Sequence, residues 1–365
     1  MRILVATGAS GGHIFPALAC IDLLAKQQHM YDTLLVLPKK IRIAPETLRG
    51  YKHICVASIS CGWPLGLRSV VAATAFLKTI AQSFFILVEF RPHIVVGFGS
   101  LATVPLILWA WFFRIHTIIH EQNVIPGRAN ALLSLVADTM AVSFSQTREY
   151  LKSASRKTIV TGNVLRFAMR RVARKEAAQF FGLSPQKFTI LVMGGSQGSH
   201  RLNTISLDAI AQLADRAALQ IIHLTGIQDY DYIQRRYREL GVEARVFTFF
   251  KEMQHAYSAS DLAISRAGAT TIAELICFQL PALLVPYPFA YKHQEANAKT
   301  LASERSVLVV NEENLNPATL RTILEELLRD RERLSRMRQA YVNTALGQAE
   351  TTLCDAILAF TQVHP

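Results

Sequence analysis

One local pattern occurs twice in this chain and restricts the fold more than any other feature: a short apolar run, a glycine-rich loop and the start of a helix. The first copy is Ile3–Ala6 with the loop that leads to His13, and the second is "FTILVMGGSQGSHRLN", Phe188–Asn203. A strand, a glycine loop and a helix form the opening unit of a doubly wound α/β domain. The repetition therefore predicts an α/β fold with two Rossmann-like domains.

Apolar bursts alternate with amphipathic stretches along both halves, as in βα units on a parallel sheet. The domain boundary is expected near "TGNVLR", before a basic stretch, which gives an N-terminal domain of residues 1–163 and a C-terminal domain of residues 164–341. A C-terminal helix within residues 342–365 is expected to return to the first domain. One large sheet is the alternative, and the two independent glycine loops argue against it. Further strands are expected at Thr33–Leu37, Ile54–Ile59, Ile94–Gly97, Thr117–His120, Thr139–Val142, Thr158–Thr161, Gln220–Leu224, Arg245–Phe249, Leu262–Ser265, Ala282–Val285 and Val307–Val310.

The first glycine loop, Gly8–Gly12, directs backbone N–H groups toward a helix start and so predicts an anion site. It is not a P-loop, because no Gly-Lys-Ser/Thr follows, and it lacks the glycine spacing of a dinucleotide fingerprint. His13 stands in the first helical turn, where the helix dipole is expected to lower the pKa of its imidazole, as a general base requires. A structural turn and a helix-capping histidine are the alternatives at this point.

Two loops of the second half are also candidates for phosphate binding. "MGGSQGS" offers glycine N–H groups with the side chains of Ser196 and Gln197, and "ISRAGATTIAE" places Gly268 before a helix start. Glu274 follows one helical turn later, where a carboxylate can accept hydrogen bonds from ribose hydroxyls. An ordinary capped helix with an exposed Glu274 is the alternative.

Other polar residues follow expected strands. Gln294 and Asn297 of "HQEANA" either contact a sugar or are routine loop residues, and "HEQN", His120–Asn123, ends a strand. Ligands of open α/β sheets bind at the carboxyl ends of strands.

The chain carries 39 Lys and Arg against 27 Asp and Glu, a net charge of +12, which favours an anionic partner. The segment Gly66–Arg91 mixes large apolar residues with Arg68 and Lys78, so it is either a core stripe or an apolar patch lying on an anionic membrane. The apolar run Val104–His120 is interrupted by Arg114 and His116 and is too short to span a bilayer. We expect no transmembrane helix.

The 5 cysteines form no Cys-x-x-Cys pair and no Cys/His cluster, so they are expected to be reduced thiols, with no metal site. No secretory signal is apparent. The cations are spread along the chain without interleaved aromatics, which argues against a nucleic-acid partner. The missing dinucleotide fingerprint argues against a nicotinamide dehydrogenase.

Taken in order, the segments "SGGHIFPALA", "HEQN", "GN" before Arg166, "GGSQGS", "SRAGATTIAEL" and "HQEANA" resemble the MurG family of glycosyltransferases. The resemblance covers most of the chain. It implies a GT-B fold, in which two Rossmann-like domains face an interdomain cleft. The lipid acceptor would bind to the N-terminal half and the nucleotide-sugar donor to the C-terminal half.

The resemblance also implies roles for individual residues. Ser10, Gly11 and Gly12 match the family's first glycine loop, near the donor sugar and the acceptor diphosphate, and His13 matches the proposed catalytic base. Phe250 would meet the uracil through its backbone, Glu274 the ribose and Gln294 the N-acetylglucosamine. The full set that matches donor-contacting positions is Asn123, Arg166, Ser196, Phe250, Ala269, Thr270, Thr271, Ile272, Ala273, Glu274 and Gln294.

The implied reaction moves N-acetylglucosamine from UDP-N-acetylglucosamine, with inversion, to the 4-hydroxyl of undecaprenyl-diphosphate-linked N-acetylmuramoyl-peptide in peptidoglycan synthesis. No cofactor or metal is obligatory in it. The implied location is peripheral, on the cytoplasmic face of the bacterial inner membrane. A GT-B transferase that uses a UDP-sugar on another lipid, such as diacylglycerol, is the alternative.

The chain departs from the family pattern in three segments. The first loop usually reads Gly-Gly-Thr-Gly-Gly-His, whereas this chain has Ala9 and Ser10, and Ala9 fits only where a positive φ is not needed. A Gly-Gly-Tyr pattern has become Gly99-Ser100-Leu101, which removes any contact of that tyrosine hydroxyl. Lys292 stands where Asp is common, which changes the local charge near the donor sugar.

Overall fold

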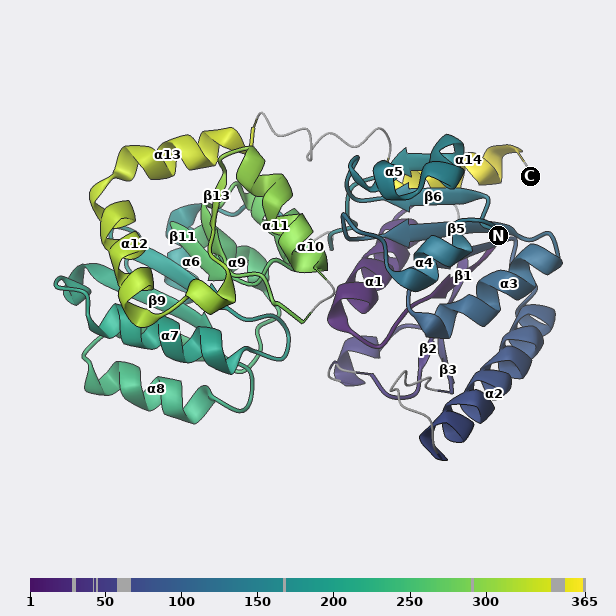
Figure 1. The fold of residues 1–365 in the computed structure, drawn as a ribbon, viewed down its shortest axis with the longest axis horizontal. Coiled ribbons are helices and arrows are strands. Elements are labelled where there is room, and N and C mark those ends of the chain that lie inside the picture. The colour runs from purple at the N-terminus through teal and green to yellow at the C-terminus, as the bar shows by residue number, and fades with distance from the viewer. Residues whose placement is uncertain are drawn as a thin grey trace. The chain divides into compact units, whose positions relative to one another are not determined.

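The structure is a computed structural model that describes residues 1–27, 31–41, 43, 45–57, 67–166, 169–289, 292–342 and 352–363. The chain divides into two compact units, one formed by Met1–Phe167 with Gln348–Pro365 and the other by Ala168–Gly347. The expected boundary between residues 163 and 164 lies slightly before this division. Figure 1 shows the ribbon of both units, and each is described by itself below.

The first unit contains a parallel sheet with the order β3-β2-β1-β4-β5-β6-β7. Its order reverses at β1, because β2 follows on one side and β4 lies on the other. The carboxyl ends of β1 and β4 therefore form the switch point at which open α/β sheets bind ligands. The strands are β1 (Arg2–Ala6), β2 (Asp32–Pro38), β3 (His53–Val56), β4 (Ile94–Gly97), β5 (His116–Glu121), β6 (Thr139–Val142) and β7 (Thr158–Val160).

Both faces of this sheet are covered, and β1 shows why. Ile3 and Val5 belong to a core on one face, whereas Leu4 and Ala6 belong to a core on the other. Such full burial is typical of a central strand in a doubly wound sheet. The helices of the unit are α1 (Gly11–Ala25), α2 (Leu67–Phe90), α3 (Val104–Phe112), α4 (Arg128–Leu133), α5 (Thr147–Tyr150) and α14 (Leu353–Val363).

The C-terminal helix α14 packs against α1 in this first unit. Its residues Leu353 and Ile357 share a core with Ile14 and Leu24 of α1. The last helix of the chain is therefore part of the same core as the first βα unit, and Figure 1 shows its yellow ribbon within that unit.

The second unit has the sheet order β10-β9-β8-β11-β12-β13, also parallel, with its switch point between β8 and β11. Together with the first sheet, this confirms the prediction of two Rossmann-like domains. The strands are β8 (Phe188–Met193), β9 (Leu219–Leu224), β10 (Glu243–Phe247), β11 (Leu262–Ser265), β12 (Ala282–Leu284) and β13 (Val307–Val309). The helices are α6 (Arg174–Phe180), α7 (His200–Ala211), α8 (Tyr230–Glu239), α9 (Met253–Ala259), α10 (Ala269–Phe278), α11 (His293–Ser303), α12 (Pro317–Arg329) and α13 (Arg331–Ala340).

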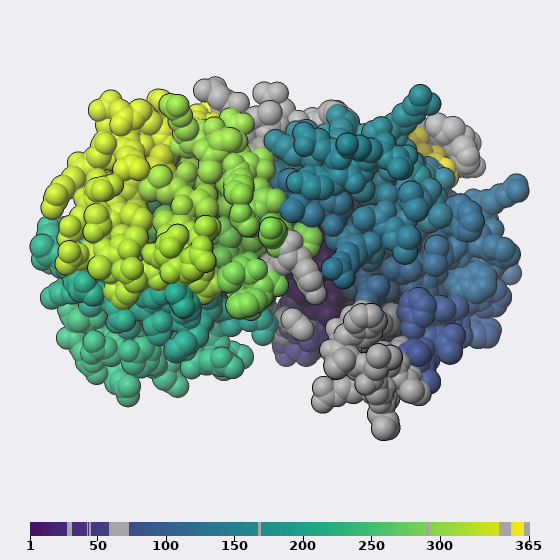
Figure 2. Space-filling model, viewed as in Figure 1, coloured from purple at the N-terminus to yellow at the C-terminus, as the bar shows by residue number. Residues whose placement is uncertain are grey.

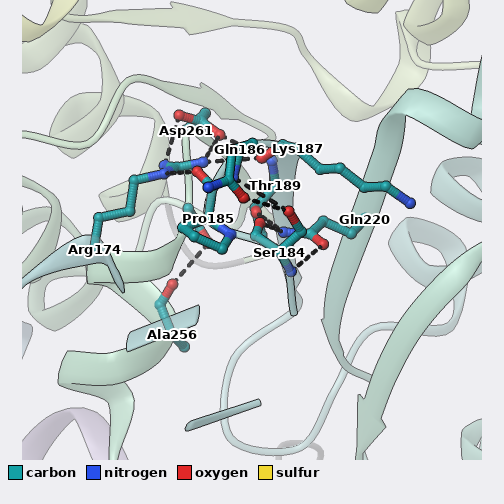
Figure 3. A network of polar contacts seen from close by, with 10 residues as sticks. Arg174, Ser184, Pro185, Gln186, Lys187, Thr189, Gln220, Ala256 and Asp261 are labelled. Carbon is teal, nitrogen blue, oxygen red and sulfur yellow. Dashed lines mark hydrogen bonds and ion pairs between the residues drawn. The ribbon is translucent and has the colours of Figure 1, made fainter. Parts of the chain in front are cut away.

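A polar network ties together the amino-terminal edge of the second sheet (Figure 3). Both terminal nitrogens of Arg174 donate to the carboxylate of Asp261, at 2.8 and 2.7 Å, and Asp261 also accepts the N–H of Thr189 at 2.9 Å. Gln220 bonds both the N–H and the carbonyl of Ser184. This network fixes the starts of β8, β9 and α6, at the edge opposite the glycine loops.

The expected strands lie close to the observed ones, with small differences at their ends. The strand expected at Arg245–Phe249 is observed as Glu243–Phe247, because the carbonyl of Phe247 still accepts the N–H of Thr225 whereas Phe249 is exposed. The expected strand Ile54–Ile59 is observed to Val56, and residues 58 and 59 lie outside the described residues.

Helix α2 is the part of the structure that bears on the expectation of no transmembrane helix. Its stretch Ala73–Phe90 is long enough and apolar enough to cross a membrane, judged by length and composition alone, and most of it is exposed rather than buried in the unit. A single helix of this kind is weak evidence for a membrane span. The run Val104–His120, in contrast, forms the short helix α3 and strand β5.

Candidate active site

The loop between β1 and α1 brings Ser10 and His13 together. The Ser10 hydroxyl lies 2.9 Å from Nδ1 of His13, so this side chain contacts the histidine rather than the N–H groups of the first helical turn. Gly8 allows the close packing, because a Cβ there would lie 2.7 Å from Cβ of Ser100 and 3.1 Å from Nδ1 of His13. The imidazole of His13 is thus held at the switch point of the first sheet, half-buried.

The departures from the family pattern in this region have different consequences. Ala9 is not among the described residues with a positive φ, so the change from glycine costs no backbone strain there. Ser100 does have a positive φ, +91° with ψ 152°, a region that only glycine adopts readily. The neighbouring Gly99 also has a positive φ, and a Cβ on it would lie 3.4 Å from Cδ2 of His13. Leu101 is partly exposed and begins a short 3-10 helix.

Glu121, at the end of β5, organises the loop that contains Asn123. One carboxylate oxygen accepts from the backbone N–H of Asn123 at 2.9 Å and from its side-chain amide at 3.2 Å. The other accepts from the N–H of Gly127 at 2.9 Å and from the amide of Asn130 at 2.8 Å. Glu121 is 2% exposed, so it orders this loop from inside the unit.

Asn130 connects this loop with the loop after β4. Its side-chain oxygen is buried and has no hydrogen-bond partner among the described residues, and it lies 3.3 Å from where a Cβ on Gly99 would be. Buried polar atoms are nearly always bonded, so an unsatisfied amide oxygen at a switch point is typical of a site that completes itself with ligand or water. The sequence analysis did not single out Asn130.

His120 does not face a ligand. Its Nε2 lies 3.0 Å from the carbonyl of Gly162, and its Nδ1 lies 3.3 Å from the amide of Gln122. Burial lowers the pKa of His120 below the ordinary histidine value, only partly opposed by the Gly162 carbonyl. This histidine of "HEQN" therefore holds the end of β7 against β5.

Arg166 lies in the first unit, with its guanidinium 5.6 Å from the ring centroid of Phe15 in α1. Phe15 belongs to the first turns of α1, two residues after His13. This places the Arg166 side chain beside the first glycine loop, a location that sequence spacing alone did not indicate.

In the second unit, the loop after β8 packs tightly on the loop after β9. Gly198 has a φ of +76°, and any Cβ on it would overlap the carbonyl of Thr225. Ser196 is exposed at the tip of this loop. Glycine is therefore required here for backbone contact, while Ser196 remains accessible to a ligand.

Arg266, after β11, connects four segments around this loop. Its guanidinium makes a two-pronged ion pair with Glu312, at 3.0 and 3.1 Å, and donates to the Ser199 hydroxyl at 2.8 Å and the Val285 carbonyl at 3.2 Å. Both Arg266 and Glu312 are largely buried, so the charge is neutralised within the unit. Arg266 thus fixes the loops after β8, β11 and β12 relative to one another.

Helix α10 begins directly at the end of β11 and has no side chain that caps its start, because its N-cap residue is Gly268. Helical geometry leaves the first N–H groups, those of Ala269, Thr270 and Thr271, without partners inside the helix. The hydroxyl of Thr270 is buried and has no partner among the described residues. This helix start therefore offers N–H groups and a hydroxyl to an anion.

The next residues of α10 have different surroundings. Ile272 is fully buried and its N–H bonds the carbonyl of Gly268, while Ala273 is partly buried. Glu274, half-buried, accepts a hydrogen bond of 2.7 Å from the hydroxyl of Tyr257 in α9. The expected alternative of an exposed Glu274 on an ordinary helix does not describe this residue.

Gln294 and Asn297 of α11 both bind the backbone of Ala267. The Gln294 side-chain oxygen accepts the N–H groups of Ala267 at 3.2 Å and Tyr287 at 2.9 Å, and the Asn297 amide donates to the Ala267 carbonyl at 3.2 Å. Asn297 is fully buried, so the idea that it reaches a sugar is wrong. Lys292, exposed with a φ of +63°, is the N-cap of this helix.

Phe250 belongs to an aromatic cluster beside the end of β10. Its ring centroid lies 4.9 Å from that of Phe247 and 5.2 Å from that of Phe181. The cluster fixes the backbone after β10, through which Phe250 is expected to act. Among the described residues, no group of three or more His, Cys, Asp and Glu side chains is arranged to hold a metal ion.

Comparisons with known proteins assign the chain to a family. Residues 3–142 match the glycosyltransferase family 28 N-terminal domain, and residues 189–352 match the glycosyltransferase family 28 C-terminal domain. The chain is 35% identical, over 93% of both chains, to the Thermodesulfovibrio yellowstonii UDP-N-acetylglucosamine–N-acetylmuramyl-(pentapeptide) pyrophosphoryl-undecaprenol N-acetylglucosamine transferase. It is 34% identical to the protein of that name from Halothermothrix orenii, over 98% of each. The chain belongs to the MurG family.

The solved structures agree with this family. The crystal structure of Acinetobacter baumannii MurG superposes with a TM-score of 0.74 at 25% identity and covers 99% of each chain. Most predicted motif residues thus gather at two places, Ser10–His13 with Asn123 and Arg166 in the first unit, and Ser196, Ala269–Glu274 and Gln294 in the second. Phe250 instead contacts the aromatic residues Phe181 and Phe247.

Three further residues at these places, Asn130, Tyr257 and Glu312, were missed. Glu312 and Tyr257 resemble an ordinary loop residue and an ordinary core aromatic in the sequence. No local signal distinguishes them.

Proposed function

We propose that this MurG-family chain transfers N-acetylglucosamine from UDP-N-acetylglucosamine to the 4-hydroxyl of undecaprenyl-diphosphate-linked N-acetylmuramoyl-peptide, with inversion. The observation that carries the proposal is the gathering of the family motifs at the switch point of each sheet, in a chain that matches its named relatives over nearly their whole length. The proposed acceptor groups lie in the first unit, and most of the proposed donor groups lie in the second, with Asn123 and Arg166 of the first unit as further donor contacts.

In the proposed reaction, the 4-hydroxyl oxygen attacks the anomeric carbon, and the bond from that carbon to the UDP oxygen breaks. His13 takes the hydroxyl proton. The Ser10 hydroxyl lies 2.9 Å from Nδ1, and in the tautomer that carries its proton on Nδ1 this contact leaves Nε2 as the proton acceptor. Ser10 stands where the family loop usually has threonine and keeps a hydroxyl beside His13.

The departing UDP carries the negative charge, and we propose that the start of α10 stabilises it. The proposed donors for the diphosphate are the N–H groups of Ala269, Thr270 and Thr271, together with the Thr270 hydroxyl, which has no hydrogen-bond partner among the described residues. Because these donors are part of the chain, the proposed reaction has no obligatory metal or cofactor. Gln294, which already ties Ala267 to Tyr287, is expected to present its amide nitrogen to the sugar.

We propose that the chain is peripheral on the cytoplasmic face of the bacterial inner membrane and binds its anionic surface through α2 and α3. These helices pack together and expose large apolar side chains, among them Phe85 and Phe112, each about two-thirds exposed at 65% and 67%. Figure 2 shows that the blue segments of this region form part of the outer surface of the first unit. The exposed cations Lys78, Arg91 and Arg114 flank them.

Vesicle sedimentation tests this surface. The double variant Phe85→Ser/Phe112→Ser is expected to lose binding to phosphatidylglycerol vesicles at least tenfold, whereas Ile227→Ser keeps it. Ile227 is a matched control because it is 85% exposed but belongs to the second unit. Equal loss in both proteins would reject the surface, as would equal binding to phosphatidylcholine. RNA is not expected to compete.

The decisive activity experiment offers radiolabelled UDP-N-acetylglucosamine with a short-chain polyprenyl-diphosphate muramoyl-peptide. Label is expected to move to the lipid, and His13→Ala is expected to lower kcat by at least about a hundredfold with little change in donor affinity. Transfer to diacylglycerol instead would favour the alternative transferase. An unchanged kcat in His13→Ala would reject the catalytic base.

A further inference from the structure

The carboxylate of Glu274 is held by a tyrosine that no motif of the family resemblance includes. The hydroxyl of Tyr257 donates to Oε2 of Glu274 at 2.7 Å, and it also lies 3.6 Å from Sδ of Met193 at the end of β8. Tyr257 is 2% exposed, and its ring stacks on Phe278 of α10 with centroids 5.1 Å apart. A buried hydroxyl thus joins β8, α9 and α10 at one carboxylate.

From this geometry we infer that Tyr257 is a positioning residue that sets the rotation of the Glu274 carboxylate for the ribose hydroxyls of the nucleotide. The inference rests on the proposed function, which assigns Glu274 to the ribose. A carboxylate has about four acceptor positions, and the tyrosine hydroxyl takes one of them. Because Tyr257 is fixed by its stacking on Phe278, the direction of that hydrogen bond is fixed as well.

The consequence for binding is specific. A carboxylate on a flexible side chain loses rotamer freedom when it binds two vicinal hydroxyls, and a residue that fixes it beforehand removes part of that cost. The gain depends on the ribose hydroxyls alone. It is absent for a nucleotide that lacks them, whereas a general packing role of Tyr257 would affect both nucleotides equally.

The test measures calorimetric affinities of the full chain for UDP and for 2′,3′-dideoxyuridine diphosphate. Tyr257→Phe is expected to weaken UDP binding about five- to tenfold, as for one side chain that must be ordered on binding, and to leave the dideoxy nucleotide within twofold. Glu274→Ala is expected to lose more UDP affinity, and adding Tyr257→Phe to it is expected to change nothing further.

Tyr341→Phe is the matched control. Tyr341 is buried in the same unit, and its hydroxyl donates to the Leu280 carbonyl at 2.9 Å rather than to Glu274. Its removal is expected to lower thermal stability without changing the preference for UDP over the dideoxy nucleotide. Glu274→Asp is a second variant, because the shorter side chain withdraws the carboxylate from Tyr257 and is expected to lose the same preference.

The outcomes separate the inference from the function. If the parent protein prefers UDP and Tyr257→Phe keeps the full preference, or loses affinity for both nucleotides alike, the positioning role is wrong and the proposed donor site stands. If the parent protein binds both nucleotides equally or neither, the assignment of Glu274 to ribose fails, and the role of Tyr257 fails with it.

Discussion

Replacement of Glu121 by glutamine is expected to destabilise the first unit strongly, although the two side chains have nearly the same shape. The carboxylate accepts four hydrogen bonds, two from Asn123 and one each from Gly127 and Asn130. A glutamine keeps one acceptor oxygen and turns an NH2 group toward the other two donors, whichever way the amide faces. Two hydrogen bonds to a charged group are lost, each about 1.5–3 kcal/mol, and two buried donors are left unsatisfied.

The expected loss of unfolding free energy is therefore about 3–6 kcal/mol, a large part of the stability of an ordinary domain. The 3 tryptophans of the chain, at positions 63, 109 and 111, all belong to the first unit, so tryptophan fluorescence during urea unfolding reports on that unit alone. Glu149→Gln, an exposed carboxylate of the same unit, is expected to stay within about 0.5 kcal/mol. A Glu121→Gln midpoint equal to that of this control would refute the reasoning.

Further predictions concern the backbone strain at Ser100, the pH dependence of the second unit's stability and the polar network at the amino-terminal edge of the second sheet. Ser100→Gly is expected to stabilise the first unit by about 1 kcal/mol in the same urea assay, because relief of a φ of +91° outweighs the entropy of the added glycine, and a lower midpoint would contradict this. Burial lowers the pKa of His223 to about 3, against about 6.5 in the unfolded chain. The contribution of neutral His223 to the stability of the second unit is thus complete above pH 6.5 and is lost at up to about 1.4 kcal/mol per pH unit as the pH falls toward 3. Calorimetry of His223→Gln should show a stability that depends less on pH over this range. An unchanged slope of stability against pH would exclude this histidine as its cause. Arg174→Ala is expected to lower the stability of the second unit by about 2–3 kcal/mol without changing UDP affinity, since its partner Asp261 lies at the opposite sheet edge from the glycine loops, and weaker UDP binding would contradict this placement.

Much of the fold was predictable because parallel sheets have a strong sequence signal. Central strands such as β1 and β8 are buried on both faces and therefore appear as continuous apolar runs. The glycine loops that follow them were predictable for a different reason. Close backbone contacts require glycine there, and Gly198 permits no side chain against Thr225. Strand ends were less certain, as at Phe247, because edge strands are only partly buried.

The residues that support the site were not predictable from local pattern. Glu312 reaches Arg266 across 46 positions and Tyr257 reaches Glu274 across 17, so neither lies in the motif it serves. Asn297 is the opposite case, because its motif left a sugar contact and a routine structural role both open, and in the structure it is fully buried with its amide bonded to the carbonyl of Ala267. Motif membership therefore identified the loops, and only tertiary packing distinguished the residues that face a ligand from those that hold the loops.

The ion pair of Arg266 with Glu312 clarifies how the second unit can bind an anion and release it. A buried guanidinium aimed at a diphosphate would hold substrate and product UDP alike, and uniform binding of this kind does not lower the barrier of the chemical step. Here the guanidinium charge is neutralised by Glu312, and Arg266 ties together the loops after β8, β11 and β12. In the proposed donor site, the groups left for the diphosphate are N–H dipoles at the start of α10, whose fixed orientation would favour the charge that develops on the leaving group without a net cation to retain it.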